Sequence, residues 1–442
     1  MKKIISIMTA LLLTLSLAVG CSQPPETPSS SAQPSSSAAE QESSETQSNA
    51  PASDVTLQFI QHMSGVITDE LQAVLDEFKA ETGITVEMSS PGSNIEEIMK
   101  TRMASNTLPD LWTTHGWSVA RYGEYLRPMN DQPFAEHIVS SIKDLITSPE
   151  GNIYVLPIDA DICGISYNAS VLEEVGVDPE SILTWQNFED ACEKIKAAGK
   201  VPVYFGGKDP LAFGQFFDFV APTLYTNNDT ENYRAEFLDG SFDWQNWNEV
   251  CEMLDRWTKN GYLNADALTA DYSTACQNLG RGDAAFMFIN ANCIVEAWTT
   301  SPDAKLGILP IPGKDSNNPR CVIGGERLAV GVWKDTPYMD EALQLITFLS
   351  EEDNCKRLAS AAGMPAGLDY AESDTGALAP YYERVMSDDI LTIPYFDRVY
   401  LPSGMWDDLC VTGANIVAQN SNAIADTITQ MEQSYQNKLA QQ

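Results

Sequence analysis

VTLQFI (residues 55–60) and ITVEM (residues 84–88) read as two strands near the start of the folded region, and the first alternates between polar and apolar side chains. The segment between them predicts a helix, since apolar residues recur at helical spacing and the pair Thr82-Gly83 is a typical helix stop. Those apolar residues are Leu71, Val74, Leu75 and Phe78. A strand, a helix and a second strand in this order are typical of an α/β sheet.

The alternation of strands and helices continues, with a helical pattern at Ile95–Met103 and a third strand that begins at Pro109–Trp112. Strands joined through helices in this way lie parallel and are linked by right-handed crossovers. Ligands of such sheets bind at the carboxyl ends of the strands, which singles out the loops at residues 61–65, 89–93 and 113–118.

The folded part is too long for a single core, since about 390 residues exceed the usual size of one domain. A second lobe is expected to begin at residues 151–157, where the next strand pattern occurs. Further strand patterns lie at residues 164–168, 201–205, 284–289, 306–310 and 328–333, and helical patterns at residues 179–199, 247–260, 274–280 and 339–351. Two α/β lobes are therefore predicted.

The first residues combine a cationic start, Lys2-Lys3, with an apolar run from Ile4 to Val19. This run is too short for a stable membrane-spanning helix and is typical of a secretory signal. The tetrad Ala18–Cys21 resembles a bacterial lipobox, although that pattern usually has Leu where Ala18 stands. The resemblance implies a signal peptide at residues 1–20 and lipidation of Cys21, and an ordinary secretory cleavage nearby is the alternative.

Residues 21–53 are almost entirely Ser, Pro, Gln, Glu, Ala and Thr after the cysteine, without an aromatic residue, Lys or Arg. Such a segment has too little apolar surface to offset the entropy of folding, so it predicts a disordered linker. A linker of this length reaches roughly 30 Å, which lets an anchored domain clear the membrane surface.

The formal net charge of −36 argues against nucleic acid as a partner, because phosphate backbones are bound through Lys and Arg. It also disfavours an anionic ligand unless a local basic pocket overrides it, and it otherwise serves solubility. Eight cysteines follow Cys21, without a C-x-x-C pair or a His spacing typical of zinc. Buried free thiols are the preferred interpretation, and disulfides, which an extracellular location permits, are the alternative. No metal or cofactor site is predicted.

An enzyme is not predicted, since the sequence holds only three histidines and lacks the H-E-x-x-H, G-x-S-x-G and phosphate-loop motifs. Ser140–Lys143 formally matches S-x-x-K, but its companion motifs are missing. A pair of acids for glycoside hydrolysis stays open at this level, because Asp and Glu are abundant.

Several segments occur in the order and at the separations of one known family. They are the opening strand–helix–strand unit, Leu108–Leu111, Tyr154–Pro157 with Tyr167-Asn168, Leu183–Trp185, Gly282–Phe286, Leu309–Gly313, Glu341–Leu349, and Trp406 before a long C-terminal helix. On these residues the region from Val55 to Gln442 resembles the family 1 extracellular solute-binding proteins, of the maltose-binding-like type.

The resemblance implies a two-lobed, periplasmic-binding-protein-like α/β fold of type II, in which each lobe is a mainly parallel sheet flanked by helices. Lobe 1 is expected at residues 54–160 and 314–362, and lobe 2 at residues 161–313 and 363–442, joined by crossover strands. Solute binds between the lobes, and an ABC permease reads their closure. The expected protein is a lipid-anchored monomer at the extracellular face of the bacterial cell membrane that captures a carbohydrate, preferably an oligosaccharide.

A sugar site needs carboxylates and amides for the hydroxyls and aromatic rings for the C–H faces. Asp161 is the first candidate, because the family places an acidic ligand contact in the crossover where it lies, with Asp159 beside it. The alternative for both is a structural role in the hinge. Trp406 matches the family's stacking aromatic, with core packing as the alternative.

The loops at the ends of the first strands supply further candidates. His115 and Trp117 align with a loop that lines the family's cleft, and Trp117 replaces a residue that is often polar. His62 follows the first strand and can donate to a hydroxyl, although a lone histidine is more often structural. Phe216 aligns loosely with an aromatic platform, and core packing is equally open.

The remaining candidates offer hydrogen bonds. Asn290 and Asn292 follow a buried strand, and Asn292 stands where relatives often carry Trp, which implies a hydrogen bond in place of a stack. Glu326 follows two glycines, which let a ligand approach the backbone. Arg398 with Asp397 forms either a fork for hydroxyls or an ion pair.

Other binding functions stay open beside the carbohydrate. The acidity suits a cation such as a polyamine, and a peptide is a further non-sugar solute for the same fold. A surface adhesin or sensor without a transporter is the remaining alternative. A neighbouring permease gene or a panel of ligands distinguishes these functions.

Overall fold

The computed structural model describes residues 54–441, except residues 64, 92–94, 117, 209, 229–230, 290 and 388. The predicted signal peptide, the lipidated Cys21 and the linker at residues 21–53 therefore lie outside the described residues. The described residues belong to one compact unit, Asn49–Gln442. Within them, no helix has both the length and the apolar character that a membrane span requires.

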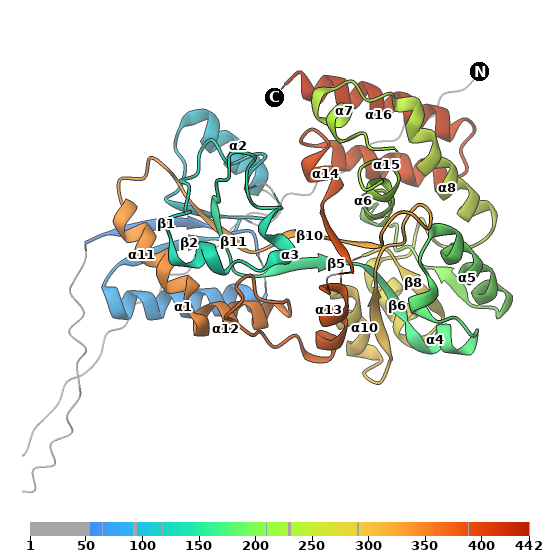
Figure 1. The fold of residues 1–442 in the computed structure, drawn as a ribbon, viewed down its shortest axis with the longest axis horizontal. Coiled ribbons are helices and arrows are strands. Elements are labelled where there is room, and N and C mark those ends of the chain that lie inside the picture. Colours follow the sequence, from blue (N-terminus) through green and yellow to red (C-terminus); the bar gives the residue numbers. More distant parts are fainter. Residues whose placement is uncertain are drawn as a thin grey trace, which may run out of the picture. The chain divides into compact units, whose positions relative to one another are not determined.

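The first lobe is built on a five-stranded sheet with the strand order β2-β1-β3-β11-β4 (Figure 1). Its strands are β1 (Thr56–Ile60), β2 (Thr85–Ser89), β3 (Leu111–Thr114), β4 (Val155–Pro157) and β11 (Ala329–Val332). β1 runs parallel to both β2 and β3, which confirms the prediction from the opening pattern, whereas β11 is antiparallel to β3 and β4. The predicted helix between the first strands is α1 (Val66–Thr82), which ends at Gly83 with a φ of 78°.

The second lobe does not begin at residues 151–157, contrary to the sequence-based expectation. Val155, Leu156 and Pro157 pair with β11 in the five-stranded sheet of the first lobe. All three are buried, and a short apolar strand carries no sequence mark of the sheet that it joins. The pairing partner, which lies far along the chain, decides the lobe to which this segment belongs.

The second lobe is built on a four-stranded sheet with the order β7-β8-β6-β9. Its strands are β6 (Ile165–Asn168), β7 (Val201–Val203), β8 (Ala284–Met287) and β9 (Leu306–Leu309). β7 and β8 are parallel, but β6 is antiparallel to both β8 and β9. The sheet is mixed rather than mainly parallel, because the chain enters β6 directly from a preceding strand without a crossover helix.

A third sheet, in the order β12-β10-β5, joins the two lobes. It comprises β5 (Ala160–Cys163), β10 (Cys321–Glu326) and β12 (Leu391–Pro394). Two residues separate β4 from β5, and two separate β10 from β11, so the chain passes twice between the first sheet and this one. Figure 1 shows β5 and β10 between the two groups of helices. The lobe boundaries at residues 160–161, 313–314 and 362–363 stay predictions.

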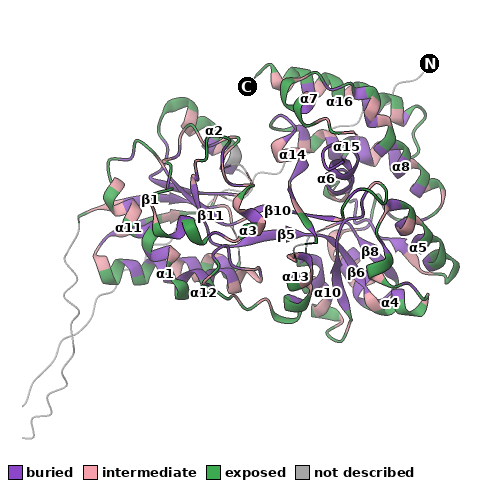
Figure 2. Ribbon diagram, in the orientation of Figure 1, coloured by how far each residue is buried: buried purple, intermediate pink, exposed green. Residues whose placement is uncertain are grey.

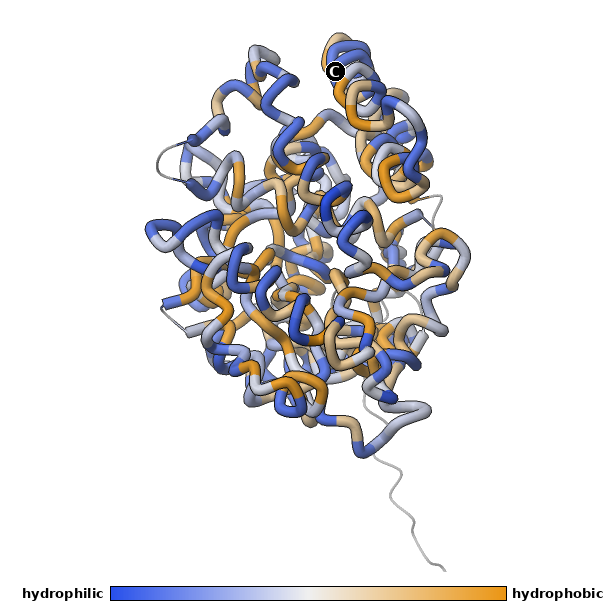
Figure 3. Tube along the Cα trace, turned by 90° about the vertical axis from the view of Figure 1, so that its right-hand side faces the viewer, coloured by the Kyte–Doolittle hydropathy of each residue, from blue (hydrophilic) through white to orange (hydrophobic). Residues whose placement is uncertain are grey.

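Helices flank the sheets, and their outer faces are exposed while most of the strands are buried (Figure 2). The helices of the first lobe after α1 are α2 (Ile95–Ser105), α3 (Ser140–Lys143), α11 (Met339–Ser350) and α12 (Glu352–Ala362). Those of the second lobe are α4 (Ala169–Glu174), α5 (Trp185–Ala197), α6 (Leu211–Tyr225), α7 (Arg234–Asp239), α8 (Asn248–Lys259), α9 (Tyr272–Arg281), α10 (Asn292–Thr300), α13 (Ala379–Val385), α14 (Phe396–Val399), α15 (Met405–Val417) and α16 (Ala423–Leu439). The C-terminal α16 shows orange and blue residues interspersed in Figure 3, as a helix with one buried face does.

α6 lies at the centre of the second lobe, and the sequence patterns did not predict it. Nearly every residue from Phe213 to Tyr225 is buried, so the helix lacks the one-sided apolar stripe that reveals surface helices. Its aromatic side chains stack on those of neighbouring helices, as Phe217 does on Trp247 with ring centroids 5.6 Å apart. α6 is therefore a core helix of the second lobe.

The cysteines follow the preferred prediction. All eight that lie within the described residues are buried and free of disulfides. Burial favours the neutral thiol, and it raises the pKa of Cys321 and of Cys355 to about 12. These side chains act as small apolar groups in the core.

Candidate functional site

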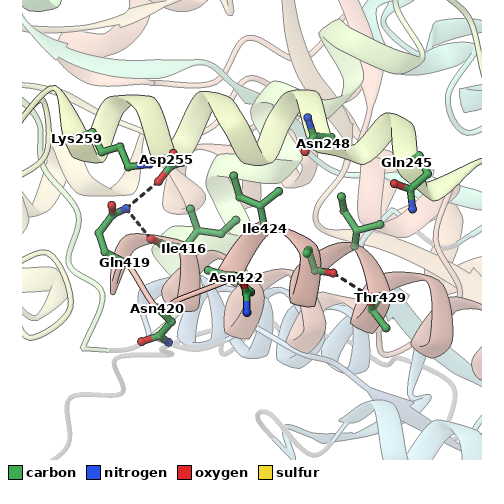
Figure 4. Close-up of a pocket in the computed structure, with 13 residues that line it drawn as sticks. Gln245, Asn248, Asp255, Lys259, Ile416, Gln419, Asn420, Asn422, Ile424 and Thr429 are labelled. Atoms are coloured by element: carbon green, nitrogen blue, oxygen red, sulfur yellow. Dashed lines mark hydrogen bonds and ion pairs between the residues drawn. The ribbon is translucent and has the colours of Figure 1, made fainter.

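A hollow of about 610 Å³ lies away from the junction of the lobes. Figure 4 shows it between α8 and the α15–α16 segment, where Gln419 donates to Asp255 at 3.0 Å. Amides, one Asp–Lys pair and aliphatic side chains line it, and no aromatic residue is among them. All its walls belong to the second lobe, so a solute bound there would not favour one arrangement of the two lobes over another.

Three smaller hollows share lining residues, and two of them, the charged and the hinge hollow, take residues from both lobes. The aromatic hollow, of about 330 Å³, is lined by Tyr204, Phe205, Leu211, Gln215, Tyr272, Phe288, Asn292 and Trp406, among others. The charged hollow, of about 360 Å³, is lined by His115, Arg121, Gln215, Asp218, Tyr395, Asp397, Arg398 and Trp406, among others. The hinge hollow, of about 390 Å³, is lined by His62, Met63, Val66, Asn292, Arg327 and Ala361, among others.

We call these three hollows together the cleft, because neighbouring ones share lining residues. Gln215 and Trp406 line both the aromatic and the charged hollow, and Asn292 lines both the aromatic and the hinge hollow. The charged hollow takes His115 from the first lobe and Trp406 from the second. A ligand in this cleft therefore contacts both lobes, which is what a closure signal requires.

Trp406 is held at the centre of the cleft by its position on α15. It is the second residue of that helix, and its indole lies against Gly214 of α6. A Cβ atom at Gly214 would lie 3.0 Å from the Trp406 ring, so glycine makes room for the indole. The ring is partly exposed and offers an apolar face to both adjacent hollows.

Arg398 on α14 spans from the second lobe to the first. Its Nη1 donates to the carbonyl oxygen of His115 at 2.8 Å, and its Cζ lies 3.7 Å from the ring centroid of Tyr395. Arg121 makes a second contact between the lobes, since its Nη2 donates to Ser403 Oγ at 3.0 Å. Arg398 therefore has protein partners on both sides of the cleft, in addition to the face that it turns to the charged hollow.

His62 and His115 form a pair at the ends of the first-lobe strands, with ring centroids 4.4 Å apart. The Nδ1 atom of His62 lies 2.6 Å from Thr113 Oγ1. Burial, and after it Arg327 and Arg398, lowers the pKa of His62 to about 4. Burial and the neighbouring His62 also hold the pKa of His115 well below its usual value. Both rings are neutral at ordinary pH, which suits hydrogen bonds to uncharged hydroxyls.

Asp159 lies in the hinge and has protein partners. It is 0% exposed, accepts a hydrogen bond of 2.8 Å from Leu328 N and lies 3.5 Å from Arg327 Nε. Burial raises its pKa to about 6 although Arg327 opposes the shift. Asp159 therefore lies behind the surface of the cleft, in the structural position that the sequence left as an alternative.

Asp161, on β5, is likewise turned into the protein. It is 4% exposed, accepts a hydrogen bond from the Tyr395 hydroxyl and contacts Cys163 Sγ at 3.3 Å. None of the three hollows has it among its lining residues. In this structure Asp161 bonds to Tyr395, and the guanidinium of Arg398 lies over the ring of that tyrosine. Asp161 therefore acts on the cleft through Tyr395 and Arg398.

Two other candidates are buried as well. Glu326 is 2% exposed and accepts hydrogen bonds from Ser118 N at 3.0 Å and Thr114 Oγ1 at 3.3 Å. Phe216 is 0% exposed and packs on Trp257 with ring centroids 5.4 Å apart. The structure therefore places Phe216 in the core, the alternative that the sequence left open, and Glu326 beneath the His115–Ser118 loop.

The cleft thus brings together His62, His115, Asn292, Arg398 and Trp406 from the predicted set. Trp117 and Asn290 lie outside the described residues. The sequence reasoning missed several lining residues, namely Arg121, Tyr204, Gln215, Asp218 and Tyr272. Gln215 and Asp218 had a usable signal, because they are polar residues three apart, and so on one face, in an otherwise apolar helix.

Comparison with known proteins adds three findings. The family of bacterial extracellular solute-binding proteins matches residues 64–354. The melibiose/raffinose/stachyose-binding protein MelE of Bacillus subtilis is 33% identical over 343 residues, which cover 77% of this chain and 79% of MelE. The streptococcal multiple sugar-binding protein of Streptococcus mutans is 21% identical over 382 residues, 80% of this chain and 85% of that protein.

Two solved structures share the fold at similar sequence identity. A binding protein of Bacillus subtilis in an open conformation matches with a TM-score of 0.83 at 31% identity, over 87% of this chain and 98% of that one. A sugar transporter protein of Bacillus licheniformis in complex with stachyose matches with a TM-score of 0.74 at 31% identity, over 86% of this chain and 99% of that one.

The loop at Gly116 offers a test of the contact between the lobes. Gly116 has a φ of +83°, and a Cβ atom there would lie 2.7 Å from Arg398 Cδ. Gly116→Ala should lower the free energy of unfolding by about 1 kcal/mol more than Gly151→Ala, because Arg398 has to give up its bond to His115. Gly151 has a φ of +85°, and a Cβ atom there would have no other atom within 4 Å. Gly151→Ala therefore measures the cost of the left-handed backbone without a side-chain clash. Urea unfolding measures both.

The same comparison in an Arg398→Ala background provides the control. Removal of the arginine leaves the new methyl group without a clash, so the excess cost of Gly116→Ala over Gly151→Ala should vanish. An excess that persists without Arg398 would show that the methyl group clashes with something else.

Proposed function

The chain belongs to the bacterial extracellular solute-binding proteins, and within that family we propose that it captures oligosaccharides with an α-linked galactosyl unit. Its role as the carbohydrate-binding component of an ABC transporter follows from its relatives. The similarity to MelE over most of both chains is the observation that carries the choice of sugar, since MelE is named for melibiose, raffinose and stachyose. The stachyose complex of the Bacillus licheniformis protein supports the same class.

The chemistry of the cleft fits such a ligand. The aromatic rings of Trp406, Tyr204 and Tyr272 line the same hollow, which suits the C–H face of a pyranose. Gln215 and Asn292 supply amide donors and acceptors for hydroxyl groups. Three adjoining hollows that share lining residues offer room for more than one sugar ring.

Ligand capture is proposed to close the lobes and so to signal to the permease. The structure matches the open conformation of one relative better than the stachyose complex of another, with TM-scores of 0.83 and 0.74. This difference supports the interpretation of the present arrangement as the ligand-free one. A sugar that contacts both His115 and Trp406 favours the closed state by the binding free energy that it gains there over the open state.

The cellular setting is part of the same proposal. We place the protein at the extracellular face of the bacterial cell membrane as a monomer, held by lipid on Cys21. The lipobox-like tetrad Ala18–Cys21 supports the anchor, and the Ser-, Pro- and Glu-rich composition of residues 22–53 supports a tether. The relatives are solute-binding proteins, and the chain is proposed to release its sugar unchanged.

Thermal unfolding of the chain from Asp54 onward tests the choice of ligand. Melibiose, raffinose and stachyose should raise Tm, while maltose, spermidine and a short peptide should not. A ligand at about 100 times its Kd stabilises the folded state by about 2.7 kcal/mol, which raises Tm by a few degrees. A shift with maltose alone would keep the carbohydrate but reject the galactosyl unit. A shift with spermidine or the peptide alone would reject the sugar.

Trp406→Ala should weaken raffinose binding by about 1–3 kcal/mol, because the stacking face is lost while the hydroxyl partners stay. Isothermal titration calorimetry measures the change. Trp298→Ala is the matched control, since Trp298 lies on α10, donates to the Ala304 carbonyl at 2.9 Å and lines none of the three hollows. If the Trp406 variant and the wild type bind raffinose with equal affinity, the sugar does not bind against Trp406.

Cys21→Ala should release the protein from the membrane fraction of expressing cells, because the anchor needs the thiol of that residue. Fractionation and immunoblotting of cells and medium measure the distribution. Cys192→Ala, at a buried cysteine of α5, should leave the protein in the membrane fraction. Membrane retention of the Cys21 variant would contradict the lipid anchor.

A further inference from the structure

α6 carries an aspartate that is completely buried at the edge of the cleft. Asp218 is 0% exposed and contributes to the wall of the charged hollow. Its Oδ1 accepts a hydrogen bond of 2.9 Å from the backbone N–H of Asp397. Its Oδ2 is buried as well, and no N–H or hydroxyl donor among the described residues reaches it. An ionised carboxylate in this position would leave a charged oxygen unsatisfied, which is costly.

The side chain of Asp397 resolves this cost. α14, which carries Asp397, packs against α6, and the bond from the Asp397 backbone N–H to Asp218 Oδ1 holds these two residues in contact. A carboxylate only accepts hydrogen bonds, so two carboxyl groups can bond only if one of them carries a proton. One proton shared between the two side chains would satisfy the buried Oδ2 of Asp218 and leave the pair with one negative charge.

The surroundings place the proton on Asp218. Burial raises the pKa of Asp218 well above its usual range, and the charge of Asp397 raises it further. Burial also raises the pKa of Asp397, but Arg398, the hydrogen bond from Asp218 and Arg121 all oppose that shift. Asp397 is partly exposed and lines the hollow beside Trp406, so the negative charge faces the cleft.

We propose that Asp218 stays protonated and thereby positions the Asp397 carboxylate as an acceptor for sugar hydroxyls. This role depends on the sugar-binding function proposed above, since it concerns the same cleft. Asp397 is the residue that contacts the ligand, and Asp218 is a positioning residue that acts through it. The O–H of Asp218 occupies one lone pair of Asp397 and leaves others for the ligand, and hydroxyl-to-carboxylate bonds are charge-assisted.

The other charged and titratable groups around the pair keep one protonation state near neutral pH. They are Arg121 and His115 from the first lobe, Arg398 and Tyr395 on and before α14, Asp161 behind Tyr395, and Asp407 and Cys410 on α15. Burial keeps His115 neutral by lowering its pKa, and burial raises the pKa of Cys410 to about 12. Burial also raises the pKa of Tyr395 well above its usual value. As pH rises, the charge around the pair therefore changes when Asp218 and Asp397 lose their shared proton.

Two variants of equal charge separate the roles of the aspartates. Asp218→Asn keeps an N–H donor toward Asp397 and leaves the negative charge where it is proposed to lie. Asp397→Asn removes the charge from the cleft and leaves Asp218 without a carboxylate acceptor. Asp397→Asn should therefore weaken raffinose binding about tenfold or more relative to Asp218→Asn at pH 6. Equal weakening by the two variants, or the reverse order, would overturn the assignment.

Asp218→Ala provides the complementary comparison. It removes the donor altogether and should weaken raffinose binding about tenfold, whereas the conservative Asp218→Asn should restore most of the affinity. Thermal unfolding without ligand confirms that each variant is folded before the titrations are compared. Loss of binding in both Asp218 variants, with Tm preserved, would overturn the positioning role.

A measurement without sugar tests the proton by itself. Folded Asp218 keeps its proton to higher pH than an unfolded aspartate, whose pKa is about 4, so folding takes up a proton between these two values. Wild-type stability should therefore fall relative to Asp218→Asn as pH rises, and the difference in Tm should grow until the folded group ionises. A difference that does not change with pH would overturn the protonated state of Asp218.

The two sets of results keep the proposals apart. If the wild type binds none of the galactosides, the proposed function fails, while the ligand-free pH comparison still decides whether Asp218 is protonated. If the sugars bind and the pH comparison is flat, the proposed function stands and the proton-sharing pair is wrong.

Discussion

The double passage of the chain between the lobes is the constraint on which the rest of the structure depends. β4 leads into β5, and β10 leads into β11, with two residues at each junction. At these junctions Asp159 and Arg327 approach to 3.5 Å, with Asp159 fully buried. A buried carboxylate needs such a partner, and breaking the pair by removing one member costs several kcal/mol. The short junctions keep the lobes adjacent and place the cleft directly above the hinge.

Neither lobe forms the proposed binding site by itself. The first lobe contributes loops at the ends of parallel strands, where His62 and His115 lie. The second contributes α6 and the start of α15, where Gly214 seats the indole of Trp406. Because its walls are divided in this way, occupancy of the cleft can bias the arrangement of the lobes, whereas the larger hollow of Figure 4 is confined to one lobe and cannot do so.

The parts that the sequence predicts correctly are those with a local physical signature. α1 has an apolar stripe and a glycine stop, so both its face and its end were visible. α6 is buried on nearly all sides and has no stripe, and for this reason Asp218 was missed. The sequence predicts Asp161 as a ligand contact but not its bond to Tyr395, which lies 234 residues away, because no local pattern reveals a contact at that separation. Partners brought by the fold, more than residue type, decide which polar side chains are available to a ligand.

The same reasoning explains why net charge was a poor guide to the solute. A chain of formal charge −36 suggests a cation, yet the acidic groups at the cleft have partners within the protein. Asp159 faces Arg327, Asp161 accepts from Tyr395, and Asp218 shares a proton with Asp397 beside Arg398. A polyamine would have to compete with these arginines for each carboxylate, at the cost of burying them unpaired. An uncharged polyol needs only the remaining lone pairs and N–H groups, so the described cleft is electrostatically matched to a neutral sugar.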